Sequence, residues 1–499
     1  MGMISGNELF GKTLKMAGID TLWYITGAPM GDMARACIKE GIRGVDVRHE
    51  QAAAMAAHAW ARLTRQPGAC SAASGPGMTN LITGISNAFS DAAPLIAMGG
   101  ASSTFLFNAG DFQELDQLAM MKPTTKWADR ILDTNRIPEF LGLAYTRAMT
   151  GCRGPVYLDV PGDVVYGNVD EDKVRYPTFI KDIPRPMADP AEVRKAAELL
   201  RRAERPVLVT GSGVHWSDAG AAMERFVNKT GIPFYTTPIS RGSVPEDNPR
   251  SFLAARNTAF READVILVVG TRFNFIIGFG KAPRFNADAK VINANIDPTT
   301  INHNRGTDAA LIGDARMIFD QLTDELSGME RLEDTPWINR LRQKDRENSE
   351  KMDPLLNSNQ TPIHPLRLCK EVRDFLDRDA ILVVDGHVTL NFARQSIPTH
   401  ASGHRLNAGP FGTMGVAVPF GMGAKVAKPD TQVLVLSGDG SFGFNGLEYD
   451  TCVRHNIPLV TVVVNNGGWA GGPGPGEELR LGQHLGYSDY HKIAEIFGA

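Results

Sequence analysis

The segment that decides the fold runs from Leu434 to Trp469 and reads LVLSGDGSFGFNGLEYDTCVRHNIPLVTVVVNNGGW. Two apolar, strand-like runs in it end in small residues with oxygen-bearing side chains, first Gly438-Asp439-Gly440-Ser441 and later Asn465-Asn466. Residues 441–464 are enough for one crossover helix and the next strand. A right-handed crossover brings the carboxyl ends of both strands to one edge of a parallel sheet, where ligands of such sheets bind.

The residue types at this edge indicate what they could bind. Asp and Asn side chains supply only oxygen ligands, which favours Mg²⁺ or Ca²⁺ over zinc. The glycines beside Asp439 allow backbone N–H groups to approach a phosphate closely. An Asp-Gly turn after a strand is by itself usually only a turn. Together with the spacing and the Asn pair, it predicts a shared site for Mg²⁺ and a polyphosphate.

The composition excludes several classes of protein. A chain of 499 residues is too long for one core, and 43% hydrophobic with 22% charged residues is typical of a soluble globular protein. The net charge of -4 gives no electrostatic reason to expect nucleic acid or a membrane as partner. No apolar run reaches membrane-spanning length. The five cysteines form no CxxC pair, so we expect buried thiols in a cytoplasmic protein: Cys37, Cys70, Cys152, Cys369 and Cys452.

Strand-like runs followed by helical patterns recur in three stretches of the chain. This rhythm predicts an α/β fold in which each parallel sheet is covered by helices on both faces. A polar, proline-bearing segment, VRYPTFIKDIPRPMADP, separates the first two stretches, and a charged segment precedes Thr361. The sequence therefore predicts three consecutive doubly wound parallel-sheet domains, at residues 1–170, 190–325 and 361–499.

Two further motifs extend the pattern of the C-terminal segment. RHEQAAAMAAHAWARLT places Glu50 at the start of an alanine-rich helix, where the helix dipole alone would also favour a carboxylate. GPFGTMGVAVPFGMGAK places Met414 in a glycine-rich loop before an apolar helix. With the GDG and NN motifs, these stretches resemble the thiamine diphosphate (ThDP) enzymes of the acetolactate synthase and pyruvate decarboxylase superfamily, over nearly the whole chain. The resemblance implies pyrimidine-binding, central and diphosphate-binding domains, in that order.

The resemblance also implies roles for individual residues. Glu50 would hydrogen-bond a pyrimidine ring nitrogen of the cofactor and so favour removal of the thiazolium C2 proton. Met414 would be the apolar wedge that bends the cofactor, and the Gly412 carbonyl would accept a hydrogen bond from its amino group. The implied Mg²⁺ ligands are Asp439, Asn466 and the carbonyl of Gly468, and Gly440 and Ser441 would hold the diphosphate. The implied cofactor-binding residues at this edge are Gly438, Asp439, Gly440, Ser441 and Asn466. Because the family's active sites form between two subunits, a homodimer or homotetramer is expected.

Several stretches are most similar to the 2-hydroxyacyl-CoA lyase and oxalyl-CoA decarboxylase branch of this superfamily. They include FREADVILVVGTRFNFIIGFG and RLNAGPFGTMGV. NNGGWAGGPGPGEEL counts against an acetolactate synthase, which carries a different run after the metal-binding Asn. Phe112-Gln113 stands where the decarboxylases tend to carry Tyr-Glu, which favours the lyase. Oxalyl-CoA decarboxylase and an acetolactate synthase-like 2-oxo-acid carboligase or decarboxylase remain alternatives, as does a family member that has lost catalysis.

The expected activity is cleavage of a 2-hydroxyacyl-CoA to formyl-CoA and an aldehyde or ketone, or the reverse condensation. Proton handling is assigned to Glu50, Gln113 and His49, with Glu477 or Glu478 as further candidates. Trp469 is expected to restrict the carbon chain, so that short 2-hydroxyacyl groups are preferred. Candidate substrate and CoA contacts, each of which could instead be an ordinary packed or surface residue, are Phe112, Arg256, Arg272, Asn274, Arg394 and Gln395.

Two features depart from the branch. Trp469 replaces the Ile-Tyr that commonly follows the NN-x-G motif in the lyases and decarboxylases. In relatives the third domain continues with a strand, a helix and a tail that closes over the acyl-CoA. Either these elements are missing from the sequence or this protein lacks them, and we expect the first.

Overall fold

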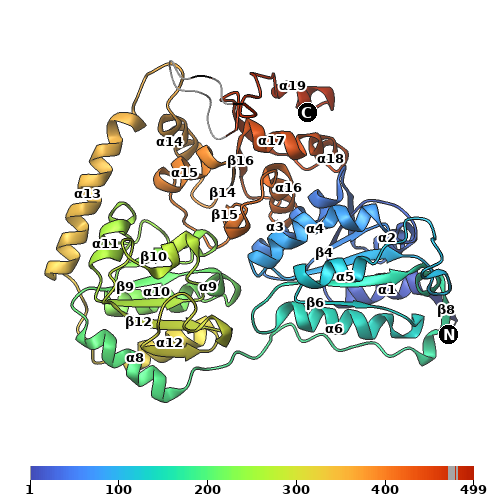
Figure 1. Cartoon of the computed structure of the whole chain (residues 1–499), viewed down its shortest axis with the longest axis horizontal. Helices are drawn as coiled ribbons and strands as arrows, with labels where there is room; N and C mark the ends of the chain where they lie inside the picture. Colours follow the sequence, from blue (N-terminus) through green and yellow to red (C-terminus); the bar gives the residue numbers. More distant parts are fainter. Residues whose placement is uncertain (1, 470–477, 479–480) are drawn as a thin grey trace. The chain divides into compact units, whose positions relative to one another are not determined.

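A computed structural model of the chain describes residues 2–469, 478 and 481–499. The chain divides into two compact units, one of Met1–Ile183 with Asn407–Ala499 and one of Pro184–Leu406. Figure 1 shows that helices cover strands in each of them. Within the described part of the chain, no helix combines the length and the apolar character needed to cross a membrane.

The N-terminal part of the first unit contains a six-stranded sheet in the order β3-β2-β4-β5-β7-β6, in which all neighbours are parallel. Its strands are β2 (Thr21–Tyr24), β3 (Arg43–Asp46), β4 (Gly68–Ala72), β5 (Leu95–Ala101), β6 (Trp127–Arg130) and β7 (Pro155–Pro161). Its helices are α1 (Gly6–Met16), α2 (Met30–Lys39), α3 (Glu50–Thr64), α4 (Pro76–Ser90), α5 (Gln117–Met121), α6 (Ile137–Met149) and α7 (Gly162–Tyr166). The short strands β1 (Met3–Ser5) and β8 (Asn168–Asp170) pair antiparallel beside it.

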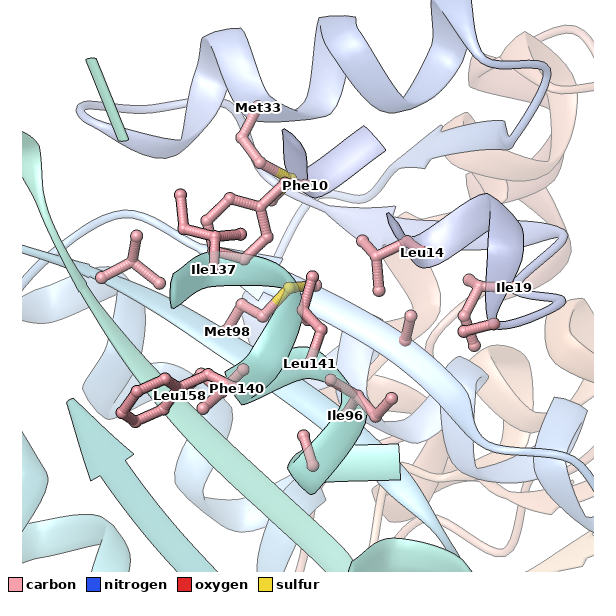
Figure 2. Packing of buried hydrophobic residues seen from close by; sticks show 14 of the residues in the cluster. Phe10, Leu14, Ile19, Met33, Ile96, Met98, Ile137, Phe140, Leu141 and Leu158 are labelled. Carbon is pink, nitrogen blue, oxygen red and sulfur yellow. The ribbon is translucent and has the colours of Figure 1, made fainter. Parts of the chain in front are cut away.

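Successive side chains of a strand point to opposite faces of the sheet, so every second residue faces the same set of helices. Ile96 and Met98 of β5 share a buried core with Phe10 of α1, Met33 of α2 and Leu141 of α6, and Figure 2 shows these side chains together. Burial of such a continuous apolar cluster is the main driving force that holds these helices on the sheet.

Helix α3 belongs to a second packing layer of this unit. It packs against α4 and against α16 (Ala417–Ala427). A Cβ added to Gly423 of α16 would lie 2.2 Å from the carbonyl oxygen of Ala56, so only glycine allows this approach of the two helices. The alanine-rich face of α3 is therefore a contact surface for the C-terminal part of the same unit.

The remaining C-terminal elements of the first unit form the sheet edge at which the sequence predicts a site for Mg²⁺ and a polyphosphate. Strands β16 (Val433–Gly438) and β17 (Val460–Val464) are parallel, with Gly438 opposite Val464. Between them lie α17 (Asp439–Asn445), the 3₁₀ turn η10 (Gly446–Glu448) and α18 (Tyr449–Arg454), and α19 (His491–Ile496) follows. The register places the residues after both strands at the same edge.

The second unit contains a five-stranded parallel sheet in the order β10-β9-β11-β12-β13. Its strands are β9 (Pro206–Thr210), β10 (Phe234–Thr236), β11 (Val265–Val269), β12 (Lys290–Asn295) and β13 (Ala309–Ile312). Its helices are α8 (Pro190–Arg202), α9 (Ser212–Trp216), α10 (Gly220–Thr230), α11 (Arg256–Glu262), α12 (Ala315–Glu325) and α13 (Pro336–Leu356). Separate apolar cores lie under α8, α10 and α12 and under α11 and α13.

The same unit also contains α14 (Pro365–Phe375), β14 (Ile381–Asp385), α15 (His387–Ser396) and β15 (Arg405–Leu406), and β14 pairs parallel with β15. Parallel sheets flanked by helices thus make up both units, and the α/β fold class predicted from the sequence is confirmed. The antiparallel β1–β8 pair was not expected.

Candidate functional site

The ends of β16 and β17 bring together the residues predicted to bind a metal. Gly468 N–H donates both to Asp439 Oδ2, at 3.1 Å, and to Asn466 Oδ1, at 3.2 Å. Asp439 is only 2% exposed, and its Oδ1 accepts a hydrogen bond from Gly440 N at 2.8 Å. The carboxylate and the amide oxygen therefore converge on one backbone group, the N–H of Gly468.

This donor set suits a hard cation. One carboxylate, one side-chain amide and one backbone carbonyl leave room for the oxygens of a phosphate and for water, which is how Mg²⁺ is commonly held. No group of three or more His, Cys, Asp or Glu side chains that could bind a metal occurs within the described residues. The chemistry at this edge thus fits Mg²⁺ shared with a polyphosphate better than a zinc site.

Trp469 covers the first turn of α17. A Cβ added to Gly440 would lie 2.7 Å from Cε3 of the indole, so glycine is needed for the ring to lie there. The indole also packs edge-on against Phe444, with ring centroids 6.1 Å apart. Trp469 therefore lies against Gly440, which with Ser441 is predicted to hold the diphosphate. The residues that follow it, including Glu477, lie outside the described part of the chain, and Glu478 is exposed.

Glu50 is the first residue of α3 and is half-buried. Its Oε2 accepts a hydrogen bond from Asn80 Nδ2 of α4 at 2.9 Å. His49 caps the helix, because its Nδ1 accepts from Gln51 N at 3.2 Å. This leaves Nε2 as the ring nitrogen of His49 that is not used by the cap. The N-terminal position also stabilises the Glu50 carboxylate through the helix dipole.

A glycine-rich turn joins Glu50 to Gln113. A Cβ on Gly77 would lie 3.5 Å from Glu50 Oε1, and one on Gly75 would lie 2.6 Å from the carbonyl oxygen of Gln113. Gly75 has φ +57°, which favours glycine, and Ser74 Oγ donates to Gln113 Oε1 at 3.3 Å. Gln113 itself has φ +60°, an uncommon conformation for a side-chain-bearing residue and one that is often found at functional sites.

A buried hydrogen-bond network supports this turn from behind. Gln117 Oε1 accepts from Gly75 N at 3.0 Å, and Gln117 Nε2 donates to Gly100 O and to Asp159 Oδ1. Tyr157 OH donates to the same Asp159 oxygen at 2.9 Å. Because every one of these groups is buried and paired, the turn that carries Gly75 is held rigidly.

The loop before α16 presents the residues assigned to the bent cofactor. Gly412 has φ +70°, and a Cβ there would meet no atom within 4 Å, so the space above it is open. Met414 is 43% exposed, which is high for a large apolar side chain. The next carbonyl, that of Gly415, accepts from Asn445 Nδ2 at 2.6 Å. The loop is thus fixed to the end of α17 while Met414 stays available to a ligand.

Within one chain, Asp439 and the residue next to Glu50 lie at opposite ends of α17. Asp439 begins this helix, whereas Gln51, next to Glu50, donates to Asn445 Oδ1 at its other end, at 3.0 Å. Six residues of helical rise separate the two ends by about 9 Å. No hydrogen bond or ion pair between Glu50 and either Asp439 or Asn466 occurs among the described residues.

The second unit gathers arginines that the sequence analysis placed near CoA. Desolvation, followed by repulsion from Arg284, Arg394 and Arg241, lowers the pKa of Arg256 to about 9. Desolvation and repulsion from Arg284 and Arg241 also lower the pKa of Arg394. Of these four, Arg241 is paired with Glu246 in a buried salt bridge. The Nε of Arg256 is buried and has no hydrogen-bond partner among the described residues.

The other predicted substrate contacts have different surroundings. Asn274 caps the 3₁₀ turn Phe275–Gly280 by accepting from Ile276 N, and Gln395 Nε2 donates to the carbonyl of Asn391 within its own helix. Arg272 is exposed, and Phe112 is 78% exposed beside Gln113. The structure therefore brings Arg256 and Arg394 into one positive cluster and leaves the roles of the other four as predictions.

Sequence reasoning missed three residues of these sites: Asn80, Gln117 and Arg284. Asn80 could have been found from the GPGMTN turn, because α4 starts at that turn and places one of its first residues beside Glu50. Gln117 and Arg284 have no local signal, since their partners lie on other elements.

Comparisons with known proteins match all three parts of the chain to the same enzyme family. Sequence models of the thiamine pyrophosphate enzyme family match residues 4–120 (N-terminal TPP binding domain), 193–322 (central domain) and 386–499 (C-terminal TPP binding domain). A 2-hydroxyacyl-CoA lyase of Arabidopsis thaliana is 32% identical over 99% of this chain and 90% of the relative. Oxalyl-CoA decarboxylase of Escherichia coli K12 is 33% identical, over 99% and 89%. An acetolactate synthase large subunit of Mycobacterium tuberculosis is 34% identical, over 93% and 83%.

Proposed function

The chain belongs to the thiamine pyrophosphate enzyme family, and from that premise we propose that it is a ThDP- and Mg²⁺-dependent 2-hydroxyacyl-CoA lyase. The observation that carries the proposal is the cluster of Arg256, Arg284 and Arg394, whose mutual repulsion an anion would relieve. The phosphates of an acyl-CoA are such an anion, whereas a free 2-oxo acid leaves the cluster unexplained. Relatives of nearly equal identity carry three different activities, so identity alone does not choose among them.

The reaction breaks the bond between C1 and C2 of the 2-hydroxyacyl group. The 2-hydroxyl proton is lost as C2 becomes an aldehyde or ketone, and C1 gains a proton to become formyl-CoA; the condensation is the reverse. Bound ThDP supplies the electron sink that such a cleavage needs. Gln113 favours this reaction over decarboxylation, because its amide can donate to the substrate carbonyl or hydroxyl without adding a second negative charge.

The side chains around the Ser74–Gly77 turn have separate tasks. Glu50 would hold a proton at the pyrimidine ring nitrogen of bound ThDP, and Asn80 would orient its carboxylate. His49 Nε2 would accept the 2-hydroxyl proton; the helix cap engages Nδ1 and so supports this role for the other ring nitrogen. Asp439, Asn466 and the Gly468 carbonyl would hold Mg²⁺ together with the diphosphate, and Gly412 and Met414 would lie against the bent cofactor.

We further propose that two copies of the chain complete each site. Gln51, next to Glu50, donates to Asn445 at the far end of α17 in its own chain, about 9 Å of helical rise from Asp439, so a second subunit's Asp439 edge is the better partner for Glu50. A homodimer, or a homotetramer built from such dimers, follows from this arrangement.

A substrate panel tests the proposed activity against its two rivals. With ThDP and Mg²⁺ present, the protein should release an aldehyde or ketone and formyl-CoA from short 2-hydroxyacyl-CoAs. Release of CO₂ from oxalyl-CoA or from pyruvate, in place of that cleavage, would assign the decarboxylase or the synthase activity instead.

Replacing an arginine of the cluster should weaken CoA binding without affecting the chemical step. Arg394→Gln should raise KM for the acyl-CoA about tenfold and leave kcat nearly unchanged, because one charge-assisted phosphate contact is lost equally from the ground and transition states. Steady-state kinetics measure both constants. Arg261→Gln, an exposed arginine on α11, is the matched control and should change neither. An unchanged KM in Arg394→Gln would remove this residue from the CoA site.

Trp469 should set the length of the acyl chain. Since its indole forms the wall beside Gly440, wild type should prefer short 2-hydroxyacyl groups. Trp469→Ala should raise kcat/KM for long chains about tenfold relative to short ones, the scale of a few methylenes in a pocket. A chain-length series of 2-hydroxyacyl-CoAs gives this ratio, and equal turnover of long and short chains by the wild type would contradict the idea.

A further inference from the structure

A buried carboxylate lies directly behind the start of the Glu50 helix. Glu448, in η10, is 1% exposed. Its Oε1 accepts from the backbone N–H groups of Arg48 and His49, both at 3.0 Å, and its Oε2 accepts from Thr451 Oγ1 at 2.6 Å. Burial raises the pKa of Glu448 although these hydrogen bonds act in the opposite direction. Burying a carboxylate costs free energy, so its presence here calls for a reason.

The two bonded amides belong to the residues that immediately precede Glu50. They fix the direction in which the chain leaves β3 and enters α3, and the Glu50 side chain starts from that point. The Arg48 side chain makes its hydrogen bond to the more exposed Asp450, from Nε at 2.6 Å, and interacts with Glu448 through charge alone. The hydrogen bonds that Glu448 accepts from this turn come from its backbone.

Asn445, three residues before Glu448, also hydrogen-bonds the first turn of α3, and in addition it bonds the loop before α16. Its Oδ1 accepts from Gln51 Nε2 of α3, and its Nδ2 donates to the carbonyl of Gly415, which follows Met414. The short segment 445–448 thus touches both the turn that carries Glu50 and the loop that carries Met414. These two elements are the ones assigned to the pyrimidine ring and to the bend of a bound cofactor, and in the proposed dimer they serve the two different sites.

We propose that Glu448, assisted by Asn445, is a positioning residue that sets the approach of the Glu50 carboxylate to the cofactor ring. The proposal rests on the role of Glu50 proposed above. Glu448 touches neither cofactor nor substrate, and its effect is transmitted through the amides of Arg48 and His49. Displacement of a reacting group by about 1 Å can cost on the order of 100-fold in rate, so the placement of this turn has a direct catalytic consequence.

Two variants of the full-length chain separate the hydrogen-bond role from a purely structural one. In Glu448→Ala both amides lose their acceptor, whereas in Glu448→Gln the amide oxygen can replace Oε1 and the Thr451 hydroxyl can turn to accept. The measurement is proton–deuterium exchange at C2 of ThDP bound with Mg²⁺, followed by rapid quench and NMR, because this rate reports the action of Glu50 without any substrate. ThDP affinity is measured by titration calorimetry on the same samples.

We expect Glu448→Ala to slow C2 exchange by about 10- to 100-fold while ThDP affinity changes less than about threefold, and Glu448→Gln to restore most of the exchange rate. In the protein without added cofactor, amide hydrogen exchange of residues 47–51 should increase in Glu448→Ala alone. Asp450→Asn, which removes a neighbouring carboxylate from the Arg48 side chain, is the matched control and should behave as wild type.

Wild-type C2 exchange in a folded Glu448→Ala would overturn the proposal, as would a Glu448→Gln variant that is as slow as Glu448→Ala. If Glu448→Ala does not fold, Thr451→Val provides a milder test, since loss of the hydroxyl that fixes Oε2 should also slow C2 exchange. Glu50→Gln is measured in parallel. Normal exchange in that variant would contradict the proposed role of Glu50 itself, whereas slow exchange there with normal exchange in Glu448→Ala would contradict only the inference about Glu448.

Discussion

Glu50→Gln should reduce turnover by about two to four orders of magnitude, the range of a lost acid–base group, while ThDP and Mg²⁺ stay bound. The amide has nearly the shape of the carboxylate and can keep a hydrogen bond with Asn80, but it cannot supply the proton that the pyrimidine nitrogen needs. Turnover of a 2-hydroxyacyl-CoA and ThDP affinity by calorimetry give the two quantities.

Glu40→Gln is the matched control for this change, because Glu40 is an exposed glutamate of the same unit, next to the end of α2. It should leave both quantities unchanged. Near-normal turnover of Glu50→Gln would show that Glu50 is only a helix-terminal carboxylate stabilised by the dipole.

Asp439→Ala should fail in a different way, by losing the metal and with it the diphosphate. The apparent Kd for ThDP at saturating Mg²⁺ should rise by about 100-fold or more, since removing the only carboxylate of the set leaves neutral oxygens, which bind Mg²⁺ weakly. In wild type, ThDP with Mg²⁺ should raise the thermal midpoint, because a ligand that binds only the folded state stabilises it. That increase should be absent in Asp439→Ala.

Asp430→Ala, an exposed aspartate shortly before β16, controls for a general loss of negative charge. Dialysis of the wild type against a chelator should reproduce the Asp439→Ala result, and Mg²⁺ should reverse it. A thermal midpoint of Asp439→Ala that still rises with ThDP and Mg²⁺ would exclude Asp439 as a metal ligand.

The parts of the fold and site that could be read from the sequence are those with a local signal. The strand-to-turn junctions at Asp439 and Asn466 are visible because a run of apolar residues stops abruptly in small polar ones, and parallel pairing then fixes their common edge. The alternation of strands and helices likewise predicts the covered parallel sheets. The β1–β8 pair was not predicted, because strands of three residues are too short to show a periodic pattern.

The supporting residues could not be predicted, because their partners are distant in the sequence. Glu448 lies 400 residues from Arg48, and Asn445 lies 394 from Gln51. Within the quoted C-terminal segment, both look like ordinary polar residues of a helical stretch. Their roles depend on the packing of α3 against the C-terminal part of the unit, and no spacing rule contains that information.

The arginine cluster illustrates the same limit. Arg256 and Arg394 were proposed as CoA contacts because they match positions in related sequences. The sequence does not show that they lie near Arg284 and are repelled by it; the fold does. Arg394 is exposed and Arg256 is half-buried, and the repulsion that both receive from Arg284 and Arg241 is a property of three-dimensional arrangement and not of composition.

The most direct test of the proposed activity follows one carbon atom. A short 2-hydroxyacyl-CoA labelled with ¹³C at the thioester carbon C1 is incubated with the protein, ThDP and Mg²⁺, and the products are followed by ¹³C NMR. Because the bond between C1 and C2 breaks, the label should appear in formyl-CoA, or in formate after its hydrolysis, and the released aldehyde or ketone should carry none. An intact labelled substrate, or label in any product that retains the C1–C2 bond, would contradict the account.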